Sequence, residues 1–165
     1  MIPQAMEILL VEDDPIDLQL TRRELEKDDR IRIEVARDGE EALDFLLCRG
    51  AFAHRSPDHP PKLVLLDLKL PKMDGLQVLR EIKARPETRV IPVVALTSSK
   101  EEKDVVESYK LGVNSYIQKP VDFEKFRETM RAVGNYWATV NQPPPQKAFA
   151  PHEGGPASIP DAAGS

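Results

Sequence analysis

The sequence predicts an α/β protein with a doubly wound, five-stranded parallel sheet that lies between two layers of helices. Short apolar segments alternate with helical segments five times along the chain. Several of the apolar segments are continuous runs, which is typical of strands that are buried on both faces. Strands that alternate with helices form parallel sheets covered on both sides, so we expect a three-layer αβα domain.

The first half of the chain contains two predicted pairs of strand and helix. Ile8–Val11 is an apolar run, and a helix is expected from Pro15 to about Lys27, because proline is favoured in the first helical turn after an aspartate cap. Residues 31–35 alternate apolar and charged side chains, as in a strand with one buried face. Residues 40–49 place leucines three and four positions apart, which is the spacing of one helix face.

The second half continues the alternation. Two further apolar runs and a short third segment predict the strands 63–66, 91–96 and 115–119. Periodic apolar side chains predict the helices 76–85, 100–111 and 122 onward. Gly112 follows the second of these helices directly, at the position where glycine often ends a helix in the left-handed conformation.

Composition divides the chain into an N-terminal extension (1–5), a domain with a long last helix (6–142) and a C-terminal tail (143–165). The tail contains six prolines and three glycines but few bulky apolar side chains. Such a composition does not offset the entropy that ordering costs, so we expect the tail to be disordered. Within the domain, residues 50–62 form a proline-rich loop that is longer than most connections.

Charge and cysteine content restrict the classes of function. The 165 residues carry a formal net charge of −5 and give a pI near 5.3, whereas surfaces that bind nucleic acid are basic. Cys48 is the single cysteine, so no internal disulfide is possible and a reducing compartment is expected. No signal peptide or membrane span is visible. We therefore expect a cytoplasmic protein that binds neither nucleic acid nor membrane.

Charged and hydroxyl side chains follow four of the predicted strands. Glu12 and Asp13 follow the first strand, Asp67 the third, Thr97 the fourth and Lys119 the fifth. The carboxyl ends of parallel strands meet at one edge of the sheet, where such proteins bind ligands. Three acids at this edge would repel one another unless a cation joined them, and Mg²⁺ prefers such oxygen ligands. The arrangement suits phosphoryl transfer, with Asp67 as the nucleophile.

Each of these residues also has a purely structural explanation when it is taken alone. Glu12 and Asp13 could balance a helix dipole, Asp67 could be a turn residue, and Thr97 could cap a helix. Lys119 alone would most often be a solvated charge. These explanations become improbable together, because four strand ends would have to carry such residues independently.

Four sequence blocks resemble the signature blocks of response-regulator receiver domains in two-component signalling. They are VEDD (11–14), LLDLKLPKMDG (65–75), ALTSS (95–99) and YIQKP (116–120). The resemblance covers residues 6–135, with all blocks in order. It implies a flavodoxin-like (CheY-like) sheet with the strand order 2-1-3-4-5.

The resemblance also implies a role for each site residue. Asp67 would accept a phosphoryl group from a phosphohistidine on a sensor histidine kinase. Asp13, Asp67 and the main-chain carbonyl of Lys69 would bind Mg²⁺, with Glu12 acting through water. Thr97 and Lys119 would hold the phosphoryl oxygens.

Two further features are implied in the fifth block. Tyr116 matches the aromatic switch that turns inward when Thr97 moves toward the phosphoryl group. The Lys119–Pro120 bond matches the cis peptide of the family, a bond type that is uncommon elsewhere.

A narrower resemblance is to the small response regulators that are paired with bacterial and cyanobacterial phytochromes. It rests on GEEALDFLLCRG (39–50), on the proline-containing loop that follows and on NYWATV (135–140). It implies a red-light-sensing histidine kinase as the partner.

The last helix carries apolar residues at alternating intervals of three and four. They are Phe123, Phe126, Met130, Val133, Trp137 and Val140. This spacing is that of a coiled-coil seam, and we predict a symmetric homodimer through Phe126, Met130, Val133, Trp137 and Val140. The alternative is a helix that folds back on its own domain, and Gly134 within the seam would permit a bend.

Two other functions remain as alternatives to a phosphorylated signalling protein. A phosphatase of the haloacid dehalogenase type needs a second acid two residues after the nucleophile, and Lys69 stands there. A receiver-like binding module without phosphorylation would be expected to lack one of Asp13, Asp67 or Lys119, and all three are present. We therefore predict a single-domain signalling protein, rather than an enzyme with a turnover substrate, that acts through conformational change and protein contact.

Overall fold

The helices and strands follow one another in the order that the sequence predicts. The computed structural model describes residues 5–145 and 148–149. The strands are β1 (Met6–Val11), β2 (Ile31–Ala36), β3 (Leu63–Leu66), β4 (Val93–Thr97) and β5 (Ser115–Gln118). The main helices are α1 (Pro15–Leu25), α2 (Gly39–Leu46), α3 (Gly75–Ala84), α4 (Glu102–Leu111) and α5 (Phe123–Asn135). A 3₁₀ turn (Gly50–Phe52) follows α2, and a π-helical turn (Tyr136–Val140) follows α5.

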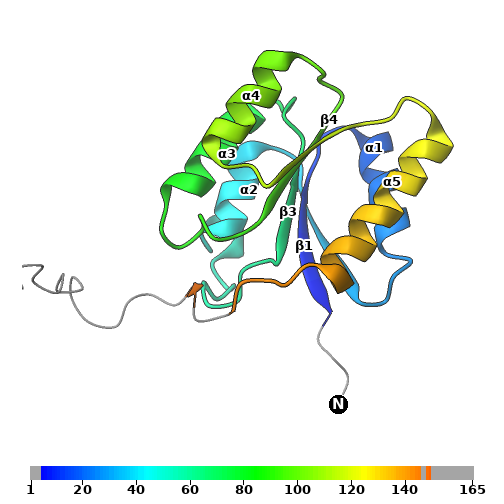
Figure 1. Ribbon diagram of the computed structural model, residues 1–165. Helices are drawn as coiled ribbons and strands as arrows, with labels where there is room; N and C mark the ends of the chain where they lie inside the picture. The colour runs from blue at the N-terminus through cyan, green and yellow to red at the C-terminus, as the bar shows by residue number, and fades with distance from the viewer. Residues whose placement is uncertain (1–4, 146–147, 150–165) are drawn as a thin grey trace, which may run out of the picture.

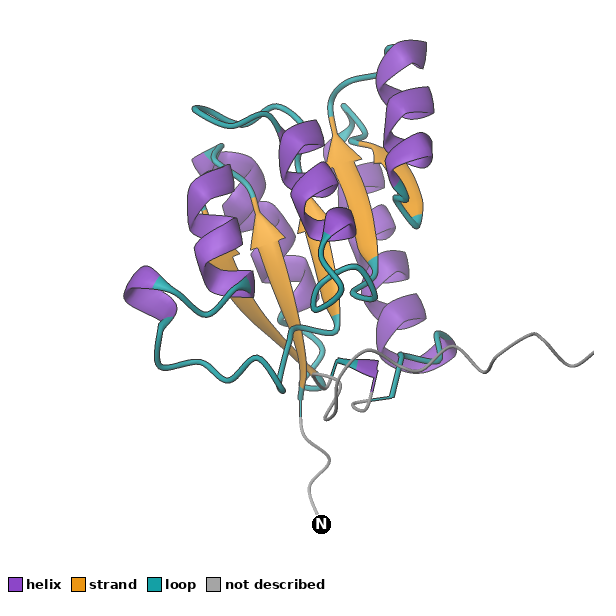
Figure 2. Cartoon of the chain, turned by 90° about the vertical axis from the view of Figure 1, so that its left-hand side faces the viewer, coloured by secondary structure: helices purple, strands orange, loops and turns teal. Residues whose placement is uncertain are grey.

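The five strands form one parallel sheet in the order β2-β1-β3-β4-β5. The strand arrows in Figure 2 accordingly point in one direction. α2, α3 and α4 cover one face of the sheet, and α1 and α5 cover the other (Figure 1). The predicted doubly wound, three-layer α/β fold and its strand order are confirmed.

The two faces of the sheet bury separate apolar clusters. Leu9 and Val11 of β1 belong to the cluster under α2 and α3, whereas Ile8 and Leu10 belong to the cluster under α1 and α5. Successive side chains of a strand point to opposite faces, so a strand between two helical layers needs apolar residues at every position. This requirement explains the continuous apolar runs in the sequence. None of the described helices is long and apolar enough to span a membrane.

The predicted ends of the helices and strands agree with the structure to within three residues. The largest difference is in α2, which ends at Leu46 rather than Arg49. Cys48 has a φ of 54°, in the left-handed region, and this conformation ends the helix. Gly112 ends α4 with a φ of 101°, as the sequence predicts.

The proline-rich loop after α2 is fastened to the domain through Arg55. The guanidinium of this residue pairs with Glu7 of β1, and it lies 3.7 Å from the centre of the Phe45 ring. Glu7 also pairs with Arg32 of β2, so one carboxylate joins the loop to two strands.

The last helix packs on its own domain. Phe126, Met130 and Val133 are buried in the cluster under α1 and α5, and Trp137 is packed against the same cluster. The prediction that these side chains form a dimer seam is therefore wrong for the three buried residues, because they are already covered within the monomer. A helix that covers a sheet and a coiled-coil helix have almost the same apolar spacing. Val140, the last residue of the predicted seam, is 65% exposed.

Gly134 lies where α5 passes close to α1 and β2. A Cβ atom at this position would lie 3.1 Å from Leu25 Cδ2 and 3.3 Å from Ile31 Cδ1. The glycine thus permits close packing, and the α-helical pattern changes to a π-helical turn after Asn135. A bend of the helix at Gly134 stays a prediction.

One residue of the expected tail is part of the core. Phe149 is 4% exposed and belongs to the cluster under α2 and α3, and the amide of Ala148 donates to the carbonyl of Pro145 at 2.9 Å. Composition summed over the whole segment conceals the apolar area that a single phenylalanine buries. The remaining predictions for the extension and the tail concern residues 1–4, 146–147 and 150–165, which lie outside the described residues.

We expect Phe149→Ala to lower the free energy of unfolding by about 3 kcal/mol, because it leaves a cavity in the core. Urea unfolding measures the change. Val140→Ala is the control, since this side chain is exposed and its truncation should change the stability by less than about 0.5 kcal/mol. Equal stability of the two variants would show that Phe149 does not hold the C-terminal segment to the domain.

Candidate functional site

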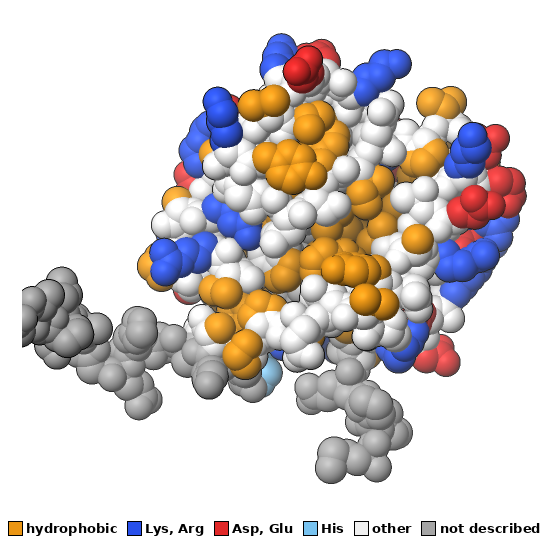
Figure 3. All heavy atoms as spheres, in the orientation of Figure 1, with side chains coloured by type: hydrophobic (Ala, Val, Ile, Leu, Met, Phe, Trp, Pro, Cys, Tyr) orange, Lys and Arg blue, Asp and Glu red, His pale blue; other side chains and the backbone are white. Residues whose placement is uncertain are grey.

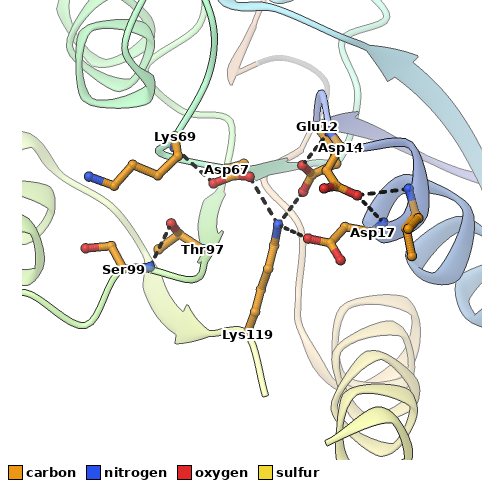
Figure 4. A network of polar contacts seen from close by, with 9 residues as sticks. Glu12, Asp14, Asp17, Asp67, Lys69, Thr97, Ser99 and Lys119 are labelled. Atoms are coloured by element: carbon orange, nitrogen blue, oxygen red, sulfur yellow. Dashed lines mark hydrogen bonds and ion pairs between the residues drawn. The ribbon is translucent and has the colours of Figure 1, made fainter. Parts of the chain in front are cut away.

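The carboxyl ends of β1, β3, β4 and β5 meet at one edge of the sheet. Glu12 and Asp13 follow β1, Asp67 follows β3, Thr97 ends β4 and Lys119 follows β5. Figure 4 shows the Glu12, Asp67 and Lys119 side chains pointing toward one another at this edge. The placement confirms that parallel strands bring residues from distant parts of the chain together.

Asp67 is held by backbone contacts on both sides. Its amide donates to the carbonyl of Val11 at 3.0 Å, which continues the pairing of β3 with β1. The amide of Lys69 donates to Oδ1 of Asp67 at 3.0 Å, so the carboxylate also stabilises the turn after the strand. Asp67 is therefore also a turn residue, as the structural alternative predicted. The turn uses only Oδ1, so the second carboxylate oxygen stays available to the site. The residue is 6% exposed.

Gly75 lets the start of α3 lie directly against this turn. A Cβ atom at this position would lie 2.4 Å from the carbonyl oxygen of Asp67 and 2.5 Å from Cα of Leu68. Both neighbours are backbone atoms that cannot rotate away. The Gly75 amide donates to the Leu68 carbonyl at 3.1 Å. Only glycine therefore fits, and this close approach sets the path of the chain after Asp67.

Lys119 is the centre of the site. Its Nζ donates to Glu12 Oε2 at 2.6 Å, to Asp17 Oδ2 at 2.9 Å and to Asp67 Oδ2 at 3.1 Å. An ammonium group has three donors, so each one has a carboxylate partner. The Lys119 amide donates to the Thr97 carbonyl at 2.7 Å, which fixes the lysine backbone beside β4.

Burial and crowding shift the pKa values of this group. The pKa of the Glu12 carboxyl is raised to about 8, chiefly because burial disfavours its charged form, and the Asp67 carboxylate adds to the shift. The bond from Lys119 acts in the opposite direction. Burial alone would lower the pKa of Lys119, but its bonds to Glu12 and Asp17 outweigh burial and raise it. The raised pKa keeps Lys119 protonated. Its single positive charge faces three acidic side chains, those of Glu12, Asp17 and Asp67.

Three acids form a set that fits a divalent cation. Glu12, Asp13 and Asp67 each offer a carboxylate oxygen, and these oxygens lie within 4.8 Å of one another. Glu12 and Asp67 are buried while Asp13 is exposed, so the set is open to water on one side. Oxygen ligands with remaining water positions are what Mg²⁺ and similar hard cations require. A cation here would also relieve the repulsion that raises the pKa of Glu12.

Thr97 is linked to β5 and α4 through Ser99. The amide of Ser99 donates to Oγ1 of Thr97 at 3.3 Å, and the hydroxyl of Tyr116 donates to the Ser99 carbonyl at 2.9 Å. The Ser99 hydroxyl donates to the buried carboxylate of Asp104 on α4. Burial raises the pKa of Tyr116, although its bond to Ser99 opposes the shift. The loop between β4 and α4 therefore connects the site to Tyr116. Thr97 does not cap α4, because the N-cap residue of that helix is Glu101.

The expected cis peptide at Lys119–Pro120 is not present: the residues that the structure describes contain no cis bond. This prediction is wrong for the structure. The trans form of a bond before proline is favoured by only about 0.5–1 kcal/mol, so the sequence alone does not determine the isomer. The one amide contact and the three Nζ contacts of Lys119 described above are all made with the trans bond.

Asp17 is a site residue that the sequence analysis missed. It lies in the first turn of α1, where an acid is usual because it balances the helix dipole. Asp14 is the actual cap of this helix and accepts from the amides of Ile16 and Asp17 at 2.9 and 3.0 Å. The one clue in the sequence was the position of Asp17: it lies in the first turn of the helix that follows the first strand, and this helix begins at the same edge of the sheet as Asp67.

Comparison with known proteins gives one family and several similar structures. Residues 8–131 match the response regulator receiver domain family. Response regulator Rcp1 of Synechocystis is 42% identical over 139 residues, which cover 82% of this chain and 92% of Rcp1. The crystal structure of its Mn²⁺-bound form has a TM-score of 0.80 at 37% identity and covers 85% of this chain and 99% of that one.

Two further structures are similar. The phosphorylated cyanobacterial phytochrome response regulator RcpA has a TM-score of 0.81 at 37% identity, covering 86% of this chain and 99% of that chain. The bacteriophytochrome response regulator AtBRR is 51% identical with a TM-score of 0.67, covering 85% of this chain and 100% of that chain.

We expect Asp13→Asn to weaken Mg²⁺ binding about tenfold or more, because it removes one charged oxygen from the acidic set. Isothermal titration calorimetry with Mg²⁺ measures the affinity. Asp14→Ser is the matched control: it removes a neighbouring exposed charge, and serine still caps α1. Equal affinities of the two variants would argue against Asp13 as a ligand.

We expect Gly75→Ala to lower the free energy of unfolding by about 3 kcal/mol or more, because the new methyl group collides with backbone atoms. Gly134→Ala is the comparison, since its methyl group meets only side-chain ends and gains helix propensity, and its stability should stay within about 1 kcal/mol of wild type. Urea unfolding of both variants measures the difference. Similar stabilities would show that the turn after Asp67 can shift to accept a side chain.

Proposed function

Because the chain belongs to the response regulator receiver domain family, we propose that Asp67 accepts a phosphoryl group from a sensor histidine kinase. The observation that carries the proposal is the contact of 3.1 Å between Lys119 Nζ and Asp67 Oδ2, next to the acidic set. A carboxylate that is buried, paired with lysine and adjacent to a cation site is suited to phosphoryl transfer, where positioning and charge neutralisation dominate.

The reaction forms one bond and breaks another. A carboxylate oxygen of Asp67 attacks the phosphorus of a phosphohistidine, the P–O bond forms and the P–N bond breaks, and the imidazole leaves and takes up a proton from solvent. Lys119 keeps its charge throughout and turns toward the phosphoryl oxygens, with Thr97 as a further donor. Bound Mg²⁺ would supply positive charge at these oxygens. Asp13, Asp67 and the Lys69 carbonyl would hold it directly, and Glu12 would hold it through water.

The conformational signal would leave the site through the loop between β4 and α4. A movement of Thr97 toward the phosphoryl group would pull on the hydrogen bond that its Oγ1 accepts from the Ser99 amide. The displacement would reach Tyr116, because the Tyr116 hydroxyl donates to the Ser99 carbonyl. Tyr116 is partly buried and packs against the cluster under α2 and α3, so a turn of its ring would change the surface beside β5. We propose that Tyr116 is the switch residue, and that a partner protein would recognise the surface that its movement changes.

A phytochrome is the kinase that we propose. The support is the similarity to RcpA and AtBRR, which are described as phytochrome and bacteriophytochrome response regulators. The conserved fold covers nearly the whole of both relatives. We also propose a cytoplasmic location, where such a kinase would present its phosphohistidine.

Self-association stays a prediction and would need surfaces other than the buried part of α5. Hydrophobic side chains gather on the face between α4 and α5 (Figure 3). Val106 and Tyr109 of α4 and Tyr136 after α5 are each more than two-fifths exposed. A homodimer would therefore use exposed residues of this kind, together with Val140.

A phosphatase is less well supported than a phosphoacceptor. The residue two positions after Asp67 is Lys69, whose Nζ lies 3.8 Å from Asp104 on α4. A lysine cannot take the acid and base role that hydrolysis of the phosphoaspartate would require at this position.

We expect wild-type protein incubated with Mg²⁺ and acetyl phosphate to gain the mass of one phosphoryl group, and Asp67→Asn to gain none. Intact-mass spectrometry measures the adduct. Asp74→Asn is the control, because it removes an exposed acid from the same region and keeps a good helix cap. A purified phytochrome kinase should transfer phosphate to the same residue. If acetyl phosphate, beryllofluoride and kinase all fail to engage Asp67, a receiver-like binding module is the correct description.

A further inference from the structure

Asp17 makes the third contact of the Lys119 ammonium. Its Oδ2 lies 2.9 Å from Nζ, closer than the Asp67 oxygen at 3.1 Å. Glu12 and Asp67 belong to the ends of strands, whereas Asp17 belongs to α1. Figure 4 shows Asp17 and Asp67 on opposite sides of the lysine nitrogen. The lysine is therefore drawn in two directions, toward the phosphoacceptor and toward the helix.

The main chain of Asp17 is fixed independently of this contact. The Asp14 carboxylate accepts from its amide at 3.0 Å and caps the helix, so Asp17 is not needed as a cap. The Asp17 side chain is 34% exposed, compared with 7% for Lys119 and for Asp67. Asp17 thus lies on the more exposed side of the ammonium group, where solvent screens part of the contact.

Phosphorylation would change the competition for Lys119. The charge of a phosphorylated Asp67 lies on the phosphoryl oxygens, and the lysine has to direct a donor to them while Asp17 still attracts it. We propose that Asp17 is a positioning residue that holds Lys119 toward α1 and so limits its interaction with the phosphoryl group. This inference rests on the proposed function of Asp67. If Lys119 moves toward a phosphoryl group on Asp67, its contact with Asp17 loosens. The start of α1 would therefore respond to the phosphorylation of Asp67.

The test compares the affinity for beryllofluoride, a phosphoryl mimic, with the affinity for Mg²⁺ alone. Asp17→Asn should bind beryllofluoride about three- to tenfold more tightly than wild type at saturating Mg²⁺, since a charge-assisted hydrogen bond that competes for Lys119 is weakened. The ¹⁹F NMR signal of the bound anion measures the affinity. Asp17→Glu keeps the carboxylate and should restore the wild-type value.

Asp14→Ser separates the contact from net charge. This variant loses one negative charge at the same helix end, keeps a cap and does not touch Lys119. Both variants should therefore change Mg²⁺ affinity alike, while Asp17→Asn alone gains in beryllofluoride affinity. A purely structural role of Asp17 would change the free energy of unfolding but would not change the ratio of the two affinities.

The outcomes distinguish this inference from the proposed function. If wild type binds beryllofluoride and Asp17→Asn binds it equally or more weakly, the role of Asp17 is refuted and the phosphoacceptor stands. If Asp14→Ser gains as much as Asp17→Asn, charge alone explains the effect and the inference fails as well. If wild type binds no beryllofluoride and forms no phosphoryl adduct, both proposals fail together.

Discussion

The site depends on one buried ammonium group. Lys119 and its partners Glu12 and Asp67 are each less than a tenth exposed, and an unpaired charge in such a place would cost several kcal/mol. The three side chains follow three different strands, so they meet only when the sheet has the observed order. β5 is separated from β3 by β4, and the long lysine side chain is what spans this distance. The fold and the charge network therefore require each other.

Most of the fold could be predicted because its pattern is local. The apolar runs are set by two-sided burial, as Leu63–Leu66 illustrates with four buried residues in succession. The site residues at strand ends could be predicted for the same reason, since parallel strands leave only one edge for them. Features that depend on contacts between distant parts of the chain could not be predicted from the sequence. Asp17 looks like any acid in a first helical turn, and Phe149 stands in a segment whose average composition is that of a tail.

The last helix shows how one pattern can have two explanations. Apolar spacing of three and four residues is expected of a helix that covers a sheet and of one that pairs with a second helix. Phe126, Met130 and Val133 cover the sheet, and the distinguishing sign is Gly134, whose missing side chain admits Leu25 and Ile31. A glycine on the apolar face is more useful for close packing within a domain than for a coiled-coil seam, where a side chain would fill the hole.

The site combines tight backbone placement with unfavourable electrostatics. Gly75 and the Asx-type turn at Lys69 fix Asp67 to the backbone, so the carboxylate cannot move away from Glu12. The raised pKa of Glu12 is the consequence of that fixed placement and of burial. A structure that only had to be stable would separate these acids or neutralise them. Holding them together lowers the stability of the domain, and the excess negative charge makes the site respond strongly to any positive charge that enters and to any change at Asp67. Under the proposed function, the same constraint that lowers stability would let a single phosphoryl group on Asp67 alter the positions of Lys119 and Thr97.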